Sequence, residues 1–294
     1  MPSKPITDPR QLPWRQRMTL CISAACIDDK GNRCIVIGSD FKAEIGEFTG
    51  AEIQNKLYWL WENSWPVLVA GTASDAHDMI ATFRNSFNRK GITDSNARDR
   101  ITEALLAHKT KFTEEYVRAA TNLSFEQFQN DKDKIDAAVW SRVWGNIGKI
   151  KADCKLILCS FSKGVPLMFE VNGDFSAMPA ERLVVPEENF LTIGTGSVIA
   201  NSMLCFREQN EDLPLNHTVY NVFEAMRFAH QASAPGVGKG HAFSCLSTSS
   251  NGRIVAKRLK KIGRDFFREQ YDQCGPKKSC KWDSVPPNRM WERY

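Results

Sequence analysis

Short apolar runs bounded by turn-forming residues recur along the chain and predict β-strands. Residues 18–27 and 33–40 are two such runs, and the polar cluster 28–32 between them is typical of a hairpin turn. Apolar or small residues occupy both alternating positions of these runs, so we expect a sheet that is covered on both faces. A third run, 65–70, ends at Gly71. Further strands are predicted at 154–161, 165–171, 190–193, 241–248 and 253–258.

Helical periodicity begins directly after the third strand. Thr72 and Asp75 have the spacing of an N-terminal capping pattern, and apolar residues follow them at helical spacing. Residues 97–147 predict two helices, the second of them capped by Ser124 and Gln127. Two more helices are predicted at 198–209 and 216–232.

The order of these elements indicates the fold class. Strands come in clusters and helices in pairs, which excludes the regular alternation of a doubly wound parallel sheet. We therefore predict an α+β fold. Its architecture is a four-layer αββα sandwich, in which two mainly antiparallel sheets stack face to face and are flanked by helix pairs.

Composition fits a globular protein and excludes several classes. Of the 294 residues, 42% are hydrophobic and 25% are charged, which rules out a disordered chain, a collagen and a coiled coil. No apolar run is long enough for a membrane span, and the N-terminal residues lack the apolar core of a secretory signal. We expect a cytoplasmic protein whose cysteines are reduced and mostly in the core. The cysteines in apolar runs are Cys21, Cys26, Cys34, Cys159, Cys205 and Cys245.

Charge is unevenly distributed, and basic residues gather at both ends. The formal net charge is +5, and residues 253–281 are the most strongly basic segment. No nucleic-acid-binding motif accompanies this segment, so we expect a solvated tail and no nucleic-acid partner. The chain is predicted to comprise an N-terminal extension or propeptide (1–17), a main domain (18–261) with a helical insertion (97–150), and a basic C-terminal extension (262–294).

Five short motifs occur in an order that points to a known family. Thr19 begins the first strand, Asp40 ends the second, and Lys56 follows Asp40 by 16 residues. Ala70-Gly71-Thr72 ends the third strand, and Gly194-Thr195-Gly196-Ser197 follows a later one. In this set and order the chain resembles the proteasome β-subunit family, which includes HslV and the Anbu-type bacterial relatives. The resemblance implies the N-terminal nucleophile (Ntn) hydrolase fold.

The resemblance also implies roles for individual residues. Thr19 would be nucleophile and base, and Lys56 would tune its amine. Asp40 would orient Lys56, while Lys42, two residues after Asp40, would support the site. Thr195 stands in place of the family's functional serine near the amine. Ala70, Gly71 and Thr72 would bind substrate, with backbone N–H groups near Gly71 serving as an oxyanion hole.

The chemistry of an N-terminal threonine explains why these residue types belong together. One residue then carries a hydroxyl nucleophile and a free amine that acts as general base. The usual pKa of an α-amine is about 7.7–8.0, and a nearby ammonium such as that of Lys56 would lower it. Attack on a peptide carbonyl would give an acyl-enzyme that water hydrolyses.

Two departures from the family pattern leave the activity open. Thr19 must become the first residue, either because translation starts at Met18 and that methionine is removed, or because residues 1–18 are cleaved. Ser233, Ala234 and Pro235 stand where the family places an aspartate. Three functions therefore remain: a threonine peptidase, an inactive ring-forming subunit with an unprocessed N-terminus, and a different amidase of the Ntn class.

The resemblance sets the expected partners. It implies a peptide or unfolded protein as substrate, self-association into a ring, and an ATPase unfoldase as a further partner. No cofactor is expected. No metal is expected either, because His77, His108, His217, His230 and His241 have no metal-binding spacing.

Overall fold

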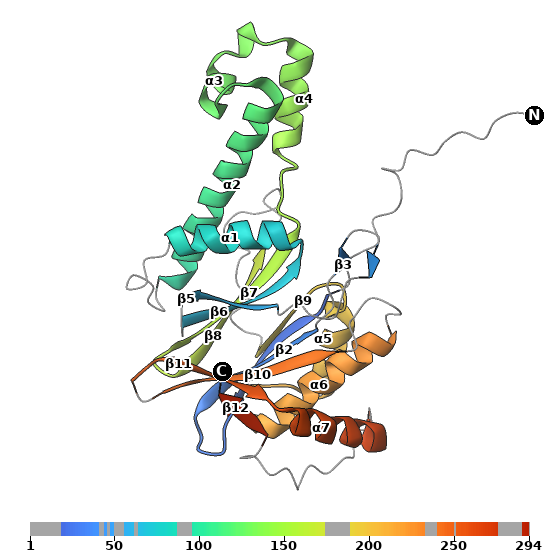
Figure 1. Cartoon of the computed structure of the whole chain (residues 1–294). Coiled ribbons are helices and arrows are strands. Elements are labelled where there is room, and N and C mark those ends of the chain that lie inside the picture. The colour runs from blue at the N-terminus through green and yellow to red at the C-terminus, as the bar shows by residue number, and fades with distance from the viewer. Residues whose placement is uncertain are drawn as a thin grey trace, which may run out of the picture.

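Two β-sheets lie face to face at the centre of the computed structural model, and helices cover their outer faces (Figure 1). The structure describes residues 19–40, 44–45, 48–49, 56–61, 64–86, 96–173, 189–232, 240–249, 251–275 and 290–293. In the described part of the chain, no helix combines the length and the hydropathy that a membrane crossing requires.

The larger sheet has six strands in the order β12-β11-β10-β2-β1-β9, and every neighbouring pair is antiparallel. The predicted hairpin forms its centre, and both of the hairpin's strands are buried along nearly their whole length. This burial confirms the expectation of a sheet covered on both faces. The strands are β1 (Cys21–Ile27), β2 (Arg33–Asp40), β9 (Phe190–Ile193), β10 (His241–Thr248), β11 (Ile254–Leu259) and β12 (Trp291–Arg293).

The smaller sheet has four antiparallel strands in the order β5-β6-β7-β8. Three of them follow the predicted runs, whereas β5 was not predicted as a strand. Its strands are β5 (Leu57–Trp61), β6 (Ser64–Gly71), β7 (Cys154–Ser162) and β8 (Val165–Asn172). A separate pair, β3 (Glu44–Ile45) and β4 (Phe48–Thr49), was also not predicted.

Helices complete the outer layers. On the smaller sheet, α1 (Ala73–Ser86) and the start of α2 (Ala97–Thr121) share an apolar core with β6 and β7. On the larger sheet, α5 (Ser197–Phe206), α6 (Leu215–Ala232) and α7 (Lys261–Cys274) form the other outer layer (Figure 1). The predicted α+β class and the four-layer αββα sandwich are therefore confirmed.

Side chains between the two sheets form the central core. Alternate residues of β1 and β2, including Cys21, Ile35 and Ile37, meet Leu68 and Ile157 of the smaller sheet. The intervening residues of β1 and β2 point to the opposite face, toward α5 and α6. Burial on both faces fixes the register of β1 and β2, because a shift of one residue would exchange the two faces.

The insertion between α1 and β7 extends away from the sandwich as a helical arm (Figure 1). Two helices were predicted here, and the structure has three: α2, then α3 (Phe125–Asn130) and α4 (Ala137–Ile147). The predicted cap is present, because Ser124 and Gln127 form a reciprocal capping box at the start of α3. The side chain of Asp136 caps the start of α4 by accepting hydrogen bonds from two backbone N–H groups.

Residues beyond 261 contribute to the sandwich in a way that the sequence did not indicate. Phe267 and Tyr271, one helical turn apart on α7, lie in the core beneath α6, and β12 pairs with β11. A high content of charged residues obscured the periodicity of α7. The domain boundaries themselves remain a prediction.

The cysteine assignment needs one correction. Cys21, Cys26, Cys34, Cys159 and Cys245 are buried, as expected. Cys205 is exposed, because α5 turns its neighbours Met203 and Leu204 toward the core instead. An apolar run in a surface helix buries only one of its faces.

Close contact between α6 and β2 at Gly38 leads to a stability prediction. A Cβ atom at Gly38 would lie 2.6 Å from Val222 Cγ1 and 2.7 Å from Met226 Sδ. We expect Gly38→Ala to lower the free energy of unfolding by about 1–3 kcal/mol through overpacking, measured by urea denaturation. Gly145→Ala in α4 is the control, because nothing lies within 4 Å of its added Cβ. Equal stability of both variants would contradict the close approach of α6.

Candidate functional site

Four polar residues predicted from separate motifs meet at one end of β1. Thr19 lies two residues before the start of β1, and Asp40 is the last residue of the neighbouring β2. Lys56 immediately precedes β5 in the other sheet, and Thr195 lies in the turn between β9 and α5. The site therefore draws on both sheets, which explains why its residues lie far apart in the sequence.

The Lys56 ammonium connects the two sheets at this point. Its Nζ donates to Thr19 Oγ1 over 3.2 Å and forms a buried ion pair with Asp40 Oδ1. Asp40 is fully buried and Lys56 is 6% exposed. A buried carboxylate fixes the position of the cation that it pairs with, so Asp40 holds the ammonium against the Thr19 hydroxyl.

Main-chain hydrogen bonds position these side chains. Asp40 N donates to Leu20 O over 3.1 Å, which aligns the end of β2 with the residue after Thr19. Val69 N donates to Lys56 O over 3.1 Å, which attaches Lys56 to β6. The side chains are thus presented from strand ends with a fixed register.

The turn after β9 holds the backbone of Thr19 on both sides. Thr19 N donates to Thr195 Oγ1 over 3.1 Å, and Gly196 N donates to Thr19 O over 3.4 Å. Gly194 has φ +101°, and a Cβ atom there would lie 2.0 Å from Thr19 O. Only glycine permits this approach. The sequence placed Gly194 in a motif but did not indicate this contact.

A cysteine lies beneath the site without being suited to react. Cys21 Sγ donates to Val69 O over 3.3 Å. Burial raises the pKa of the Cys21 thiol to about 12, although the nearby Lys56 opposes this shift. Cys21 therefore stays a neutral thiol, and Thr19 is the better placed nucleophile.

The predicted substrate-binding segment lies at the end of β6, which the Cys21–Val69 bond brings next to β1. Ala70 is buried, and Gly71 has φ +103°. A Cβ atom at Gly71 would lie 2.4 Å from Asp153 O, so this position also requires glycine.

Thr72 also binds Asp153, the residue before β7. Its N–H donates to Asp153 O over 2.7 Å and its hydroxyl to Asp153 Oδ2 over 3.2 Å. Asp75 accepts from Asp153 N over 2.7 Å. The two predicted capping residues therefore attach the start of α1 to β7 through Asp153, a residue that the sequence did not single out.

Some of the predicted features lie outside the described residues. These are Lys42 and the segment 233–235, where the family's aspartate would stand. Among the described residues, no group of three or more His, Cys, Asp or Glu side chains is arranged to hold a metal ion.

Comparison with solved structures relates the fold to known proteins. The chain is similar to Anbu, an ancestral beta-subunit, from Yersinia bercovieri, with 13% identity, TM-score 0.55, and coverage of 87% of this chain and 94% of that one. An Anbu Gly-1 mutant from Hyphomicrobium sp. strain MC1 gives 13% identity, TM-score 0.53 and the same coverage of 87% and 94%. HslV from Trypanosoma brucei shares 15% identity with this chain and gives a TM-score of 0.46, with coverage of 78% of this chain and 99% of that one.

No protein-family model matches the sequence, and no curated protein matches it. The structural similarity at 13% identity shows that the chain shares its fold with Anbu. It bears on the architecture and leaves the chemistry to be inferred from the site itself.

Proposed function

We propose that the protein is a threonine-type peptidase that uses Thr19 as its nucleophile. One observation carries this proposal: the Lys56 ammonium lies 3.2 Å from Thr19 Oγ1 and is paired with the buried Asp40. A cation beside a hydroxyl stabilises the negative charge that develops on the oxygen as its proton leaves. A buried lysine needs a counter-charge in any role, so the feature that points to catalysis is the contact of its ammonium with the Thr19 hydroxyl.

The proposed reaction begins with proton transfer within Thr19. The free amine accepts the hydroxyl proton, directly or through one water, and Oγ1 attacks the substrate carbonyl. Backbone N–H groups near Gly71 would stabilise the oxyanion, and the amine would then return the proton to the leaving amine. Water would hydrolyse the resulting ester and free Thr19 for the next cycle.

Thr195 has a defined part in this scheme. Its hydroxyl accepts a hydrogen bond from Thr19 N over 3.1 Å, and would therefore orient the amine after residues 1–18 are removed. Lys42, two residues after Asp40 in the sequence, would support the site. Peptides or unfolded proteins would be the substrates, with self-association into a ring and an ATPase unfoldase as partners.

A second function is favoured by the position of Thr19 in the chain. Here Thr19 follows Met18, so its nitrogen belongs to a peptide bond and cannot act as a base. Without processing, the same fold would serve as an inactive ring-forming subunit. The absence of an aspartate from the sequence 233–235 also favours this alternative. An Ntn amidase acting on small amides would share the nucleophile and differ in its substrate.

Covalent labelling separates these functions. We expect a peptide epoxyketone or boronate to label the purified protein at Thr19, as identified by peptide mass mapping, and to leave Thr19→Ala unlabelled. Hydrolysis of a peptide library by the same preparation would distinguish a peptidase from an amidase that accepts only small amides. Absence of labelling in a chain shown to begin at Thr19 would overturn the proposed mechanism.

A further inference from the structure

Three cysteine thiols meet inside the larger sheet, at the end of β1 that lies away from Thr19. Cys26 of β1, Cys34 of β2 and Cys245 of β10 belong to one buried core, with exposures of 0%, 1% and 5%. Cys26 and Cys34 lie on adjacent strands, and β10, which carries Cys245, pairs with the other edge of β2. Among the described residues, no group of three or more His, Cys, Asp or Glu side chains is arranged to hold a metal ion. The relevant chemistry of these three cysteines is therefore that of their thiols.

Cys26 and Cys34 are direct cross-strand partners. Asp28 N donates to Asn32 O over 2.9 Å. Asp28 and Asn32, two residues beyond Cys26 and Cys34, are therefore a hydrogen-bonded cross-strand pair. Since such pairs alternate, Cys26 and Cys34 also occupy a hydrogen-bonded position, where Cα atoms lie about 5.5 Å apart. That Cα separation is within the range of disulfides, whereas the side chains of a hydrogen-bonded pair lie farther apart than those of a non-hydrogen-bonded one. A disulfide here would therefore be strained and readily reduced. Cys245, by contrast, is the register partner of Val36, and so it lies diagonal to Cys34.

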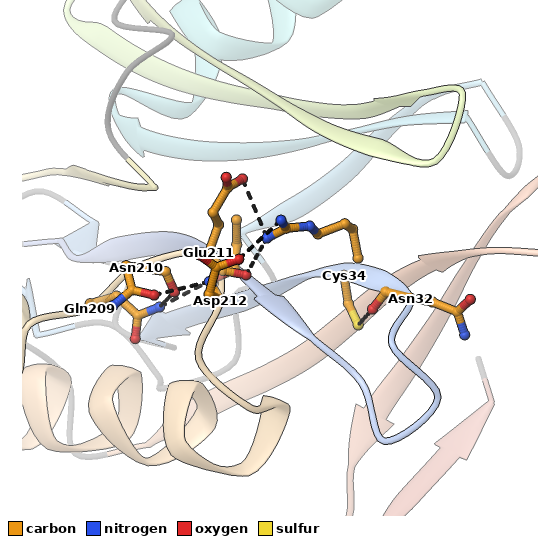
Figure 2. Close-up of polar contacts among 8 residues, drawn as sticks. Asn32, Cys34, Gln209, Asn210, Glu211 and Asp212 are labelled. Carbon is orange, nitrogen blue, oxygen red and sulfur yellow. Dashed lines mark hydrogen bonds and ion pairs between the residues drawn. The ribbon is translucent and has the colours of Figure 1, made fainter.

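The exposed hairpin gives Cys34 a route to solvent. Residues 29–32 are exposed, and Cys34 Sγ donates to Asn32 O over 3.4 Å (Figure 2). Arg33 lies between Asn32 and Cys34 in the sequence. Its guanidinium pairs with Asp212 Oδ1 over 3.0 Å and donates to Glu211 O over 2.6 Å. Glu211 and Asp212 belong to the loop that lies beside the hairpin in Figure 2. Opening of this hairpin end alone would uncover Cys34 without unfolding the sandwich.

Hydrogen bonding also distinguishes Cys34 from its neighbours. Side-chain hydrogen bonding with Cys245 and Cys26 lowers the pKa of the Cys34 thiol, although burial opposes this. The same bonds raise the pKa of Cys26 and of Cys245. Thiolate is the reactive form of cysteine, so Cys34 is the first of the three thiols to react.

We infer that Cys34 and Cys26 form a reversible intrachain disulfide when the protein meets a small hydroperoxide such as hydrogen peroxide. The Cys34 thiolate attacks one peroxide oxygen, the O–O bond breaks, and Cys34 becomes a sulfenic acid while one water is released. The Cys26 thiol then attacks the Cys34 sulfur, and the S–O bond breaks to release a second water. Two thiols are oxidised by two electrons, and hydrogen peroxide is reduced to two waters.

Peptide mapping of the full-length protein tests this inference. The reduced protein is treated with hydrogen peroxide, alkylated with N-ethylmaleimide in denaturant, and digested with trypsin without reductant. Cleavage after Lys30 and Arg33 separates the two cysteines, so a disulfide links two peptides. We expect to observe this linked pair of peptides and to lose it on treatment with dithiothreitol. Fragmentation of the linked pair should assign the disulfide to Cys26 rather than to Cys21.

Variants and an internal control make the result decisive. Cys26→Ser should lose the linked pair and instead let dimedone trap the sulfenic acid on Cys34, whereas Cys245→Ser should keep the link. Exposed Cys205 reports how much general oxidation has occurred. Recovery of Cys26 and Cys34 as maleimide adducts while Cys205 is oxidised would overturn the inference, as would a link from Cys34 to Cys245. The outcome does not depend on the proposed peptidase activity.

Discussion

Replacing Lys56 with methionine is expected to remove activity and to weaken the fold. The substitution takes away the ammonium that donates to Thr19 Oγ1 and that pairs with Asp40. Because Asp40 is fully buried, its carboxylate would lose this counter-charge without gaining water. Breaking a buried ion pair in this way costs about 3–5 kcal/mol, and loss of the tuned proton transfer should slow peptide hydrolysis by roughly 10²–10⁴-fold.

A double variant separates the two effects of Lys56. Asp40→Asn combined with Lys56→Met removes both charges, so we expect it to regain stability in urea denaturation while the rate of Thr19 labelling stays low. A Lys56→Met variant with wild-type labelling would show that the ammonium serves the fold alone. If both the single and the double variant keep wild-type stability, then the ion pair does not contribute as described.

Gly194→Ala is expected to displace Thr19 and so to abolish most activity. The added Cβ would lie 2.0 Å from Thr19 O and 2.6 Å from Thr19 C, so either the turn or the nucleophile must move. Such a movement would break the bonds that Thr195 and Gly196 make with the Thr19 backbone. A displacement of about 1 Å at a reacting group can cost about 10²-fold in rate, which a labelling time course would measure.

The hairpin provides a matched control for the glycine. Gly31 also has positive φ, +80°, but nothing lies within 4 Å of a Cβ added there. Alanine at either position carries the conformational strain of about 1–3 kcal/mol, and only Gly194→Ala carries the clash. We expect both variants to lose stability and only Gly194→Ala to lose labelling. Equal labelling of the two variants would argue against a positioning role for the turn after β9.

Much of the fold follows from the chain's pattern of apolar residues and turn formers. The hairpin of β1 and β2 was predicted because its turn cluster separates two runs that are buried on both faces. β5 was missed because its five residues, all apolar or aromatic, show no alternation. The arm was assigned two helices because Ile135 lies between the short α3 and α4 and continues the apolar spacing of Val139 and Val143 across the break.

The residues of the candidate site could not be predicted from the pattern of apolar residues and turn formers. Thr19, Asp40, Lys56 and Thr195 were singled out by resemblance, since no local pattern distinguishes a catalytic lysine from one that packs on an apolar strand. The contact of Gly71 with Asp153 joins residues that lie 82 positions apart in the sequence, so no local sequence spacing could predict it. The thiol cluster likewise needed the sheet order, because β10 reaches β2 only through the folded topology.

The N-terminal residue of the native protein tests the central claim most directly. We would determine the intact mass and N-terminal sequence of untagged protein purified from its own host. The account predicts a chain that begins at Thr19, whose free amine then lies beside Thr195 and Lys56. A chain that still carries the residues before Thr19 would contradict the account, because the base required by the mechanism would be a peptide nitrogen.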